Sequence, residues 1–496
     1  MSMDEGQTGY KPGTEVMDLR SALKLLSETP GQLLTIQEEV DPDKELAGIY
    51  KRIGTGVPTK PPTRSGPAAL FERVRGFDIR VVAGIFGTRR RTALLLGVFP
   101  DRISHALLDA LQHPVSPVIR SQTKAPCQEV VHQPPLDVLK LLPLPVNTDL
   151  DAGPYFSMGL IRAEDPETGE SDITIHRLCV QGPDLMTIWF TPGRHIDQFR
   201  MKAEQKGLSL PISINIGLDP AVYLAACFEP PTTPLGFDEL SIAGGLRGHP
   251  VELVNCVSVK GKAIAHAEIV IEGEILPGQR MREDTKTRTG YAMPEFTGYM
   301  GKAKMELPVI KVKSVTHRQD PFLQTNIGPG EEHGNLSGIP MEASILRSIG
   351  DSMPGKLLNV YAHPAGGGKL LAVMQFQKTS PADEGRQRQA ALAAFATFPE
   401  LKHVILVDGD VDLFDSNEVL WAMTTRYQGD ASTIFIPGVR CHPLDPSQVP
   451  EFSPSIRQEG ISCKTIFDCT VPYALRDQFI RSPFSEVDEE RFIKSQ

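Results

Sequence analysis

The sequence predicts a multi-domain α/β protein whose central part is dominated by β-strands. Its 496 residues are too many for a single domain, since domains average about 150 residues. Hydrophobic residues make up 40% of the chain and charged residues 23%, which supplies enough apolar material for a large core. The spacing of the hydrophobic residues changes twice along the chain. We therefore expect domains over residues 1–123, 124–325 and 326–496.

The first part is expected to be a small α/β domain. Asp18 can cap a helix, and a strand-like run over residues 33–40 and a second helix over residues 43–53 follow it. The apolar residues that recur at helical spacing after the cap are Leu19, Ala22, Leu23 and Leu26. Several prolines between residues 126 and 154 then favour an extended connector.

The central part alternates apolar and polar residues, which is the pattern of half-buried strands. The candidate strands are residues 172–180, 211–218, 251–259, 265–275 and 307–315. Few long helical patterns separate them. This part is therefore expected to form an antiparallel sheet or barrel inserted into an α/β chain.

The last part returns to strands that alternate with helices. The candidate strands are residues 357–363, 370–376 and 403–408, and the candidate helices are residues 387–398 and a segment that begins at Ser416. Asp415 and Glu418 are spaced as in a capping box at the start of the second helix. This alternation predicts a parallel α/β sheet.

Composition excludes several classes of protein. Lys and Arg number 51 against 61 Asp and Glu, so the net charge is −10 and nucleic acid is not an expected partner. The dense basic cluster at residues 89–91 is interpreted as a solvated turn. No apolar run reaches the roughly 18 residues that span a bilayer, and the polar first residues do not resemble a secretory signal. The seven cysteines are scattered and never form a CxxC pair, so we expect a cytoplasmic protein without a membrane partner.

Two further motifs do not support their usual functions. Residues 364–369 (PAGGGK) lack the spacing of a phosphate-binding loop and are interpreted as a glycine turn between two strands. The acidic residues 408–412 lack the glycine that a calcium loop requires. The sequence also contains no GxSxG or HExxH motif, which argues against the common hydrolase and metalloprotease classes.

Residues 172–180 are expected to form one strand in which Arg177 shares a face with Ile173 and Ile175. An arginine among apolar side chains either pairs with a carboxylate inside the core or grips an anionic ligand. The opposite, polar face carries Asp172, Thr174 and His176. That face can contact a ligand phosphate.

Two residues outside this strand complete a candidate metal site. His195 follows the turn Gly193-Arg194 and is either an ordinary loop histidine or a ligand. Glu239 is either an acid in the first turn of a helix or a ligand. Together with Asp172 they offer O, N and O donors, a set that suits Mn²⁺ or Mg²⁺ bound to a phosphate better than structural zinc.

Glu295 lies in a short loop flanked by proline and glycine, between Met293 and Tyr299. Phe296 and Tyr299 are expected to shield its carboxyl group from water. A carboxyl group held against aromatic rings binds its proton more tightly and can act as a general acid.

Taken together, these motifs resemble the UbiD decarboxylases, which use prenylated FMN. They are most similar to the branch that acts on 3,4-dihydroxybenzoate (protocatechuate) and gallate. The matching stretches are residues 172–177 (DITIHR), 193–195 (GRH), 215–220 (NIGLDP), 228–234 (FEPPTTP), 293–299 (MPEFTGY), 407–412 (VDGDVD) and 421–426 (WAMTTR). The resemblance extends from about residue 18 to residue 484.

The resemblance implies a fold and an activity. The fold would comprise an N-terminal α/β domain, a central flavin-binding split β-barrel and a C-terminal α/β domain with an oligomerising terminal segment. The activity would be the non-oxidative, reversible decarboxylation of a hydroxylated benzoate through a covalent prenylated-FMN adduct. Such a cofactor is needed because no side chain can accept the electrons that departing carbon dioxide leaves on an aromatic ring.

The resemblance also implies roles for individual residues. Arg177 would orient the carboxylate and Glu295 would donate the proton. Asp172, His195 and Glu239 would hold a divalent metal, Mn²⁺ or Mg²⁺, with K⁺ as a compatible further ion. The implied cofactor contacts are Asp172, Ile173, Thr174, Ile175, His176, Arg177, Arg194, His195, Glu239 and Lys402.

The chain departs from its relatives at two positions. Some relatives carry a second glutamate five residues before the acid, where this chain has Gly290, and this leaves open what Arg177 pairs with. Protocatechuate-type enzymes carry a histidine near position 320 that faces the ring hydroxyls. This chain has Asp320 there, with His317 just before it, so we take both as substrate-binding candidates.

The expected partners follow from this activity. They are a small aromatic carboxylic acid, a flavin prenyltransferase that supplies the cofactor, and further copies of the chain in a homodimer or higher homo-oligomer. One alternative is a decarboxylase of another aromatic, heteroaromatic or acrylic acid. The other is a non-catalytic flavin-binding subunit, which the presence of both Arg177 and Glu295 disfavours.

Overall fold

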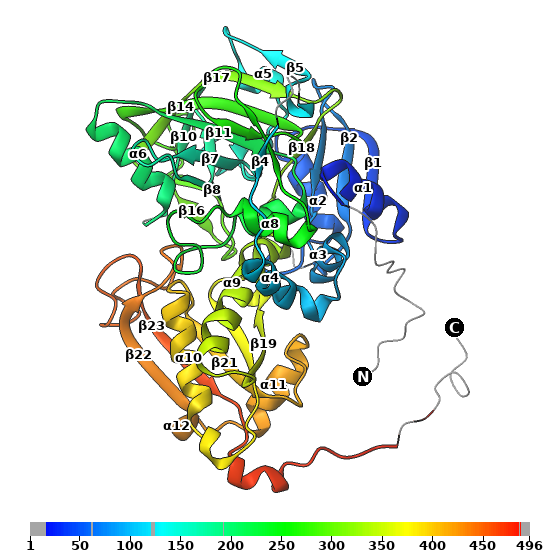
Figure 1. The fold of residues 1–496 in the computed structure, drawn as a ribbon, viewed down its shortest axis with the longest axis vertical. Coiled ribbons are helices and arrows are strands. Elements are labelled where there is room, and N and C mark those ends of the chain that lie inside the picture. Colours follow the sequence, from blue (N-terminus) through cyan, green and yellow to red (C-terminus); the bar gives the residue numbers. More distant parts are fainter. Residues whose placement is uncertain (1–15, 61–62, 121–124, 192, 486, 488–496) are drawn as a thin grey trace.

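The computed structural model describes residues 16–60, 63–120, 125–191, 193–485 and 487. The N-terminal and central parts of the chain form one lobe, and the C-terminal part forms a second lobe below it in Figure 1. The long helix α9 (Glu331–Ser352) lies where the two lobes meet. No helix in the described ranges is long and apolar enough to cross a membrane.

The N-terminal part is the α/β unit that the sequence predicted. Asp18 caps α1 (Leu19–Glu28) by accepting a hydrogen bond from the Ser21 amide, as expected. The other elements are β1 (Leu33–Val40), α2 (Glu45–Gly54), β2 (Ala68–Val74), β3 (Arg80–Ala83), α3 (Arg89–Leu96) and α4 (Ile103–Gln112). A distant strand, β18 (Phe322–Gln324), completes the sheet in the order β1-β2-β3-β18.

The basic cluster at residues 89–91 is not the solvated turn that its charge suggested. It forms the first turn of α3, and Thr88 caps that helix. The Arg89 guanidinium pairs with Glu342 at 2.7 Å and 2.9 Å. Arg91 is buried and donates hydrogen bonds to the carbonyl oxygens of Gly84 and Gly66. Pairing inside the fold therefore explains Arg89 and Arg91, whereas Arg90 is exposed to solvent as predicted.

The central part forms a nine-stranded sheet with the order β6-β9-β10-β17-β14-β11-β7-β8, and β5 pairs with β17. Its members are β5 (Val130–His132), β6 (Tyr155–Phe156), β7 (Leu160–Glu164), β8 (Ser171–Ile175), β9 (Leu178–Val180), β10 (Leu185–Ile188), β11 (Leu210–Ile216), β14 (Ile269–Met281) and β17 (Leu307–His317). The pairs along this order are antiparallel, as predicted.

The predicted single strand over residues 172–180 is interrupted. It consists of β8 and β9, with His176 and Arg177 between them. β8 is at one edge of the sheet, while β9 lies next to the strand at the opposite edge. Because so short a connection can span only about 10 Å, the sheet must curl until these edges approach each other. Arg177 therefore lies in the short connection where the two edges of the curled sheet come together.

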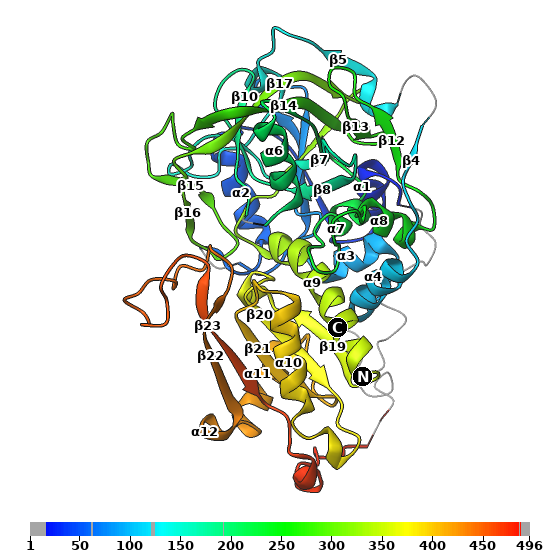
Figure 2. The same cartoon turned by 60° about the vertical axis from the view of Figure 1, so that its left-hand side comes forward.

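Shorter elements surround this curled sheet. They are β4 (Val118–Ile119), α5 (Val138–Leu141), α6 (His195–Gln205), α7 (Pro220–Ala225), α8 (Leu240–Arg247), β12 (Glu252–Asn255) and β13 (Lys262–Ile264). A hairpin of β15 (Tyr291–Pro294) and β16 (Met300–Lys302) lies on the side of the sheet nearest the C-terminal lobe (Figure 2). This hairpin carries Glu295 in its turn.

The C-terminal lobe contains a five-stranded sheet in the order β19-β20-β21-β23-β22. Its elements are β19 (Leu357–Ala362), β20 (Leu371–Phe376), α10 (Arg386–Thr397), β21 (His403–Asp408), α11 (Ser416–Thr425), α12 (Gly429–Ser432), β22 (Thr433–Arg440) and β23 (Ile461–Asp468). The three central strands are parallel as predicted, but both edge strands are antiparallel. Asp415 caps α11, whereas Glu418 pairs with Arg481 and does not complete the predicted capping box.

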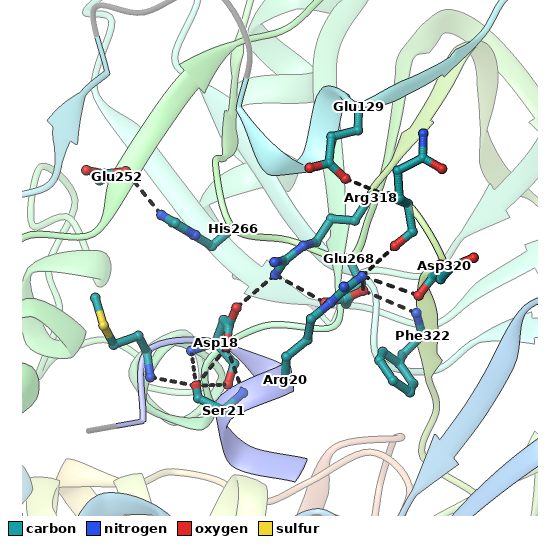
Figure 3. Close-up of polar contacts among 12 residues, drawn as sticks. Asp18, Arg20, Ser21, Glu129, Glu252, His266, Glu268, Arg318, Asp320 and Phe322 are labelled. Carbon is teal, nitrogen blue, oxygen red and sulfur yellow. Dashed lines mark hydrogen bonds and ion pairs between the residues drawn. The ribbon is translucent and has the colours of Figure 1, made fainter. Parts of the chain in front are cut away.

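A buried carboxylate fixes the N-terminal helix against the central sheet (Figure 3). Glu268 is fully buried and accepts hydrogen bonds from Arg20 at 2.8 Å and 2.9 Å and from Arg318 at 3.3 Å. The backbone carbonyl of Asp320 accepts a further hydrogen bond from Arg20 at 3.2 Å. The segment that contains Asp320 is thereby part of a structural network at the surface of the upper lobe.

Candidate active site

A cavity opens where the curled sheet meets the C-terminal lobe. Its upper wall includes Arg177 and Trp189 from the central sheet and Glu295 from the β15–β16 hairpin. His333 on α9 and Lys369 in the turn before β20 line it from below. The cavity therefore combines side chains from segments that are far apart in the sequence.

Arg177 is held by two carboxylates. Its Nε and Nη2 atoms each donate to Glu283 at 2.8 Å, and its Nη1 atom donates to Glu295. Its guanidinium also lies 4.4 Å from the centre of the Trp189 ring, which is within cation–π range. Glu283 is thus the partner of Arg177 that the sequence left open.

Glu295 is placed to hold a proton. Its backbone N–H bonds the Tyr299 carbonyl at 2.9 Å, which closes the hairpin turn. The residue is buried, and burial raises the pKa of its carboxyl group although Arg177 acts in the opposite direction. Phe296 is buried beside it as expected, but Tyr299 is 64% exposed. Only one of the two predicted aromatic rings therefore shields the acid.

The predicted metal ligands converge. Asp172 on β8, His195 at the start of α6 and Glu239 before α8 place one donor atom each within 4.8 Å of one another. His195 Nδ1 lies 2.9 Å from an Asp172 oxygen. Burial and the neighbouring Asp172 raise the pKa of Glu239 well above its usual value, and its Oε2 atom is buried without a hydrogen-bond partner.

This arrangement fits a divalent cation. The two carboxylates, Asp172 and Glu239, repel each other in one buried place unless a positive charge lies between them. An ion among them would also give the unpaired Glu239 oxygen a partner. The triad adjoins the cavity because Thr174, Ile175 and His176 continue from β8 into its lining, as does Arg194 beside His195. Ile173 is buried on the same strand.

His176 is an unusual polar group in this lining. It is buried against Phe190, with the ring centres 4.8 Å apart, and its Nε2 atom has no hydrogen-bond partner. Burial and the nearby Arg194 lower the pKa of His176 to about 3, so its ring is neutral at pH 7. An unpaired polar atom in a cavity wall is suited to contact a bound ligand.

A lysine other than the predicted Lys402 lines the cavity. Lys402 does not line the cavity, because its ammonium group pairs with Asp445 at 2.7 Å. Lys369 lines it, between Glu400 at 2.6 Å and Glu229 at 3.2 Å. The glycine turn before β20 allows this position, since a Cβ atom at Gly368 would lie 2.1 Å from a backbone oxygen of α9. The glycine run before Lys369 is therefore the feature of the sequence that could have pointed to this lysine.

The two predicted substrate residues also lie elsewhere. His317 ends β17 and bonds His132 at 2.9 Å, and Asp320 belongs to the network of Figure 3. Neither residue lines the cavity. Two histidines that were not predicted from the sequence do so, His333 and His442, and both contact Phe296. Burial lowers the pKa of His333 to about 3 and that of His442 to about 4.

Comparison with known proteins identifies one family over most of the chain. Residues 25–111, 118–332 and 334–469 match the N-terminal, Rift-related and C-terminal domains of 3-octaprenyl-4-hydroxybenzoate carboxy-lyase, the UbiD family. A curated relative is the gallate decarboxylase of Lactiplantibacillus plantarum, which is 46% identical over 96% of this chain and 99% of that protein.

Solved structures agree with this assignment. The apo 3,4-dihydroxybenzoic acid decarboxylase of Enterobacter cloacae has a TM-score of 0.92 and 56% identity, over 96% of this chain and 99% of that one. The UbiD-class enzyme HmfF of Pelotomaculum thermopropionicum, solved with FMN, has a TM-score of 0.84 and 35% identity, over 96% and 100% of the two chains. An evolved dimeric form of HmfF was solved with prenylated FMN. This chain belongs to the UbiD family and is a decarboxylase of the carboxy-lyase class.

Proposed function

We propose that this enzyme decarboxylates a hydroxylated benzoate, such as 3,4-dihydroxybenzoate, with prenylated FMN as its cofactor. The observation that carries the proposal is a buried arginine, Arg177, between two carboxyl groups. Glu283 forms a bidentate ion pair with it, whereas Glu295 accepts one hydrogen bond from it and has a pKa that burial raises. The names of the gallate and 3,4-dihydroxybenzoic acid relatives support the choice of substrate class.

The cofactor would occupy the cavity beside the metal triad. Asp172, His195 and Glu239 would hold Mn²⁺ or Mg²⁺ against its phosphate, and K⁺ stays a compatible further ion. The curled central sheet would act as a split β-barrel, and residues 173–175 of β8, with His176 after it and Arg194, would form the flavin cradle. When bound, prenylated FMN would supply the electron-accepting centre that the side chains lack.

Arg177 would orient the substrate. Three of its five N–H groups donate to Glu283 and Glu295, which leaves two for an anion. Charge-assisted hydrogen bonds from a fixed guanidinium align a carboxylate well. The bidentate pair with Glu283 and the Trp189 ring keep Arg177 in one position.

Glu295 would return a proton to the ring carbon after carbon dioxide has left. Its raised pKa favours the neutral, proton-donating form. Glu283 assists this role because it neutralises much of the charge of Arg177, which would otherwise ionise Glu295.

Neutral histidines would recognise the ring hydroxyls. A neutral imidazole can both donate and accept a hydrogen bond, which matches a phenolic hydroxyl group. His333 and His442 line the cavity and have lowered pKa values, so both stay neutral at pH 7. We therefore assign hydroxyl recognition to this pair in place of His317 and Asp320.

The remaining parts of the proposal concern assembly and cofactor supply. A flavin prenyltransferase would supply the cofactor in the cytoplasm. The C-terminal segment extends away from its lobe in Figure 1 and exposes 74% of Ile480 and 91% of Phe484. Such apolar side chains would be covered in a homodimer or larger homo-oligomer.

A non-catalytic flavin-binding subunit would not need the Arg177–Glu283–Glu295 arrangement.

The first prediction concerns the metal. Replacement of His195 by Ala should lower bound metal and bound flavin in parallel, because the triad loses its nitrogen ligand. Metal analysis and the visible flavin spectrum of the purified protein measure both. His132→Ala, which removes a histidine outside the cavity, should change neither. Full metal and flavin content in His195→Ala would make His195 an ordinary loop histidine.

The second prediction concerns substrate recognition. His333→Ala should lower kcat/KM for 3,4-dihydroxybenzoate by about 10–100-fold, the loss of one or two hydrogen bonds to the ring hydroxyls. His317→Ala should leave this value within about twofold, since His317 lies outside the cavity. A panel of hydroxylated benzoates assayed with both variants measures the difference. The reverse ranking of the two variants would restore the assignment to His317.

The third prediction concerns the acid. Glu295→Gln keeps the size of the side chain but removes its transferable proton, so turnover should fall by at least the ~10²–10⁴ typical of a general acid. Flavin and metal content should stay normal because the triad is separate. Glu274→Gln, which alters an ion-paired glutamate outside the cavity, is the matched control. Near-normal turnover in flavin-loaded Glu295→Gln would move the donor role to another group, such as Glu283.

A further inference from the structure

One segment of the cavity wall is attached to the N-terminal part of the chain. Residues 325–330 connect β18, which belongs to the N-terminal sheet, to α9. Asn326 and Gly328 in this connection line the cavity, as does His333 in the first turn of α9. The described residues that line the cavity all lie at or after position 157. The N-terminal part therefore acts on the cavity through the segments that it holds.

Lys51, near the end of α2, binds the middle of this connection. Its Nζ atom donates a hydrogen bond to the Ile327 carbonyl at 2.6 Å and another to the Pro329 carbonyl. These two acceptors flank Gly328, so one side chain holds the backbone on both sides of a residue that lines the cavity. Hydrogen bonds from a charged donor are stronger than those between neutral groups.

The surroundings of Lys51 differ from those of an ordinary surface lysine. In the part of the chain that the structure describes, its hydrogen-bond partners are the two carbonyl groups. Burial of the ammonium group lowers the pKa of Lys51 to about 7, and the charge of Glu332 opposes this shift only in part. A charged ammonium group has three N–H donors and a neutral amine has two, so either form can bind both carbonyls.

Backbone contacts fix the start of α9 on the same side. The Glu331 amide donates to the Thr55 carbonyl at 2.8 Å, and the Glu332 carboxylate accepts a hydrogen bond from the Gly84 amide at 2.8 Å. Lys51 adds hydrogen bonds from a side chain to the residues just before these contacts. The connection and the first turn of α9 are thereby held as one unit.

We propose that Lys51 is a positioning residue: its hydrogen bonds fix residues 326–330 and thereby keep His333 where it can recognise a ring hydroxyl group. The inference rests on the proposed role of His333 and extends it to the N-terminal part of the chain. Lys51 does not line the cavity, so it acts through the connection.

The charge of Lys51 is a smaller influence on His333 than its position. Burial is the main cause of the lowered pKa of His333, and Lys51 contributes less to it than Lys369 and His442 do. His333 therefore stays neutral when Lys51 is replaced by Met. A changed affinity in Lys51→Met then reports a displaced His333 and not a newly charged one.

The test compares two ligands that differ only in their hydroxyl groups, 3,4-dihydroxybenzoate and benzoate. Their dissociation constants are measured by calorimetry on protein reconstituted with FMN and Mn²⁺, because FMN lacks the prenyl-derived ring on which the proposed turnover depends. Wild type should prefer the hydroxylated acid. In Lys51→Met this preference should fall by about tenfold, the loss of roughly one hydrogen bond. Benzoate should bind within about twofold of wild type, since Arg177 is unchanged.

A double-mutant cycle separates positioning from general damage to the fold. His333→Ala should reduce the preference as well, and Lys51→Met should have no further effect in that background, because the group on which it acts is gone. Lys378→Met is the matched control. The Lys378 side chain is also largely buried and donates to a backbone carbonyl, that of Val471 at 2.9 Å, but it lies outside the cavity. This variant should keep the full preference.

The melting temperature and the circular dichroism spectrum show whether each variant is folded. If Lys51→Met does not fold, Lys51→Gln takes its place, because its amide ends about one bond short of the lysine nitrogen and cannot reach both carbonyls. A preference that is lost in His333→Ala but kept in the Lys51 variant would overturn the role of Lys51, as would an equal loss of affinity for both acids. A wild type without any preference would instead overturn the proposed role of His333, and this inference with it.

Discussion

The bidentate ion pair between Arg177 and Glu283 is the interaction on which the site depends. An arginine guanidinium buried without a partner would cost several kcal/mol, so a fixed carboxylate beside it is a structural requirement. The pair also sets the chemistry. If Arg177 faced Glu295 alone, its charge would favour the ionised acid and remove the proton that the proposed mechanism needs. In the proposed mechanism, Glu283 makes both a cationic binding group and a neutral acid available within one cavity.

The fold brings these groups together through the curl of the central sheet. Arg177 lies between two strands at opposite edges of that sheet, and Glu283 follows the long strand β14. The hairpin with Glu295 and the backbone of Lys304 come from the connection between β14 and β17. The C-terminal lobe adds His333, Lys369 and His442 from below. Opposite walls of the cavity therefore belong to different lobes.

The sequence predicted what local patterns and family motifs determine. It placed the α1 cap at Asp18 and β1 at the observed residues, and it named Asp172, His195 and Glu239 together. It missed α9 because that helix is buried on most of its surface and contains Pro340, so it shows little amphipathic periodicity. Because α9 was not predicted, His333 in its first turn was not recognised as a candidate site residue either.

The other errors concern contacts between distant segments. No spacing in the sequence reveals that Arg177 meets Glu283 across 106 positions or that Lys402 is already paired with Asp445. The position of Asp320 suggested a substrate contact, whereas the network around Glu268 holds that segment at the surface (Figure 3). Such contacts depend on the tertiary fold and can be read only from the structure.

The most direct test of the account is the product formed from 3,4-dihydroxybenzoate in heavy water. The protein would be produced with and without a flavin prenyltransferase, and carbon dioxide release and the NMR spectrum of the product would be recorded for both preparations. The account predicts turnover in the first preparation alone, with one deuterium at the carbon that carried the carboxylate. Equal turnover in both preparations, or none in a protein that carries the cofactor, would contradict it.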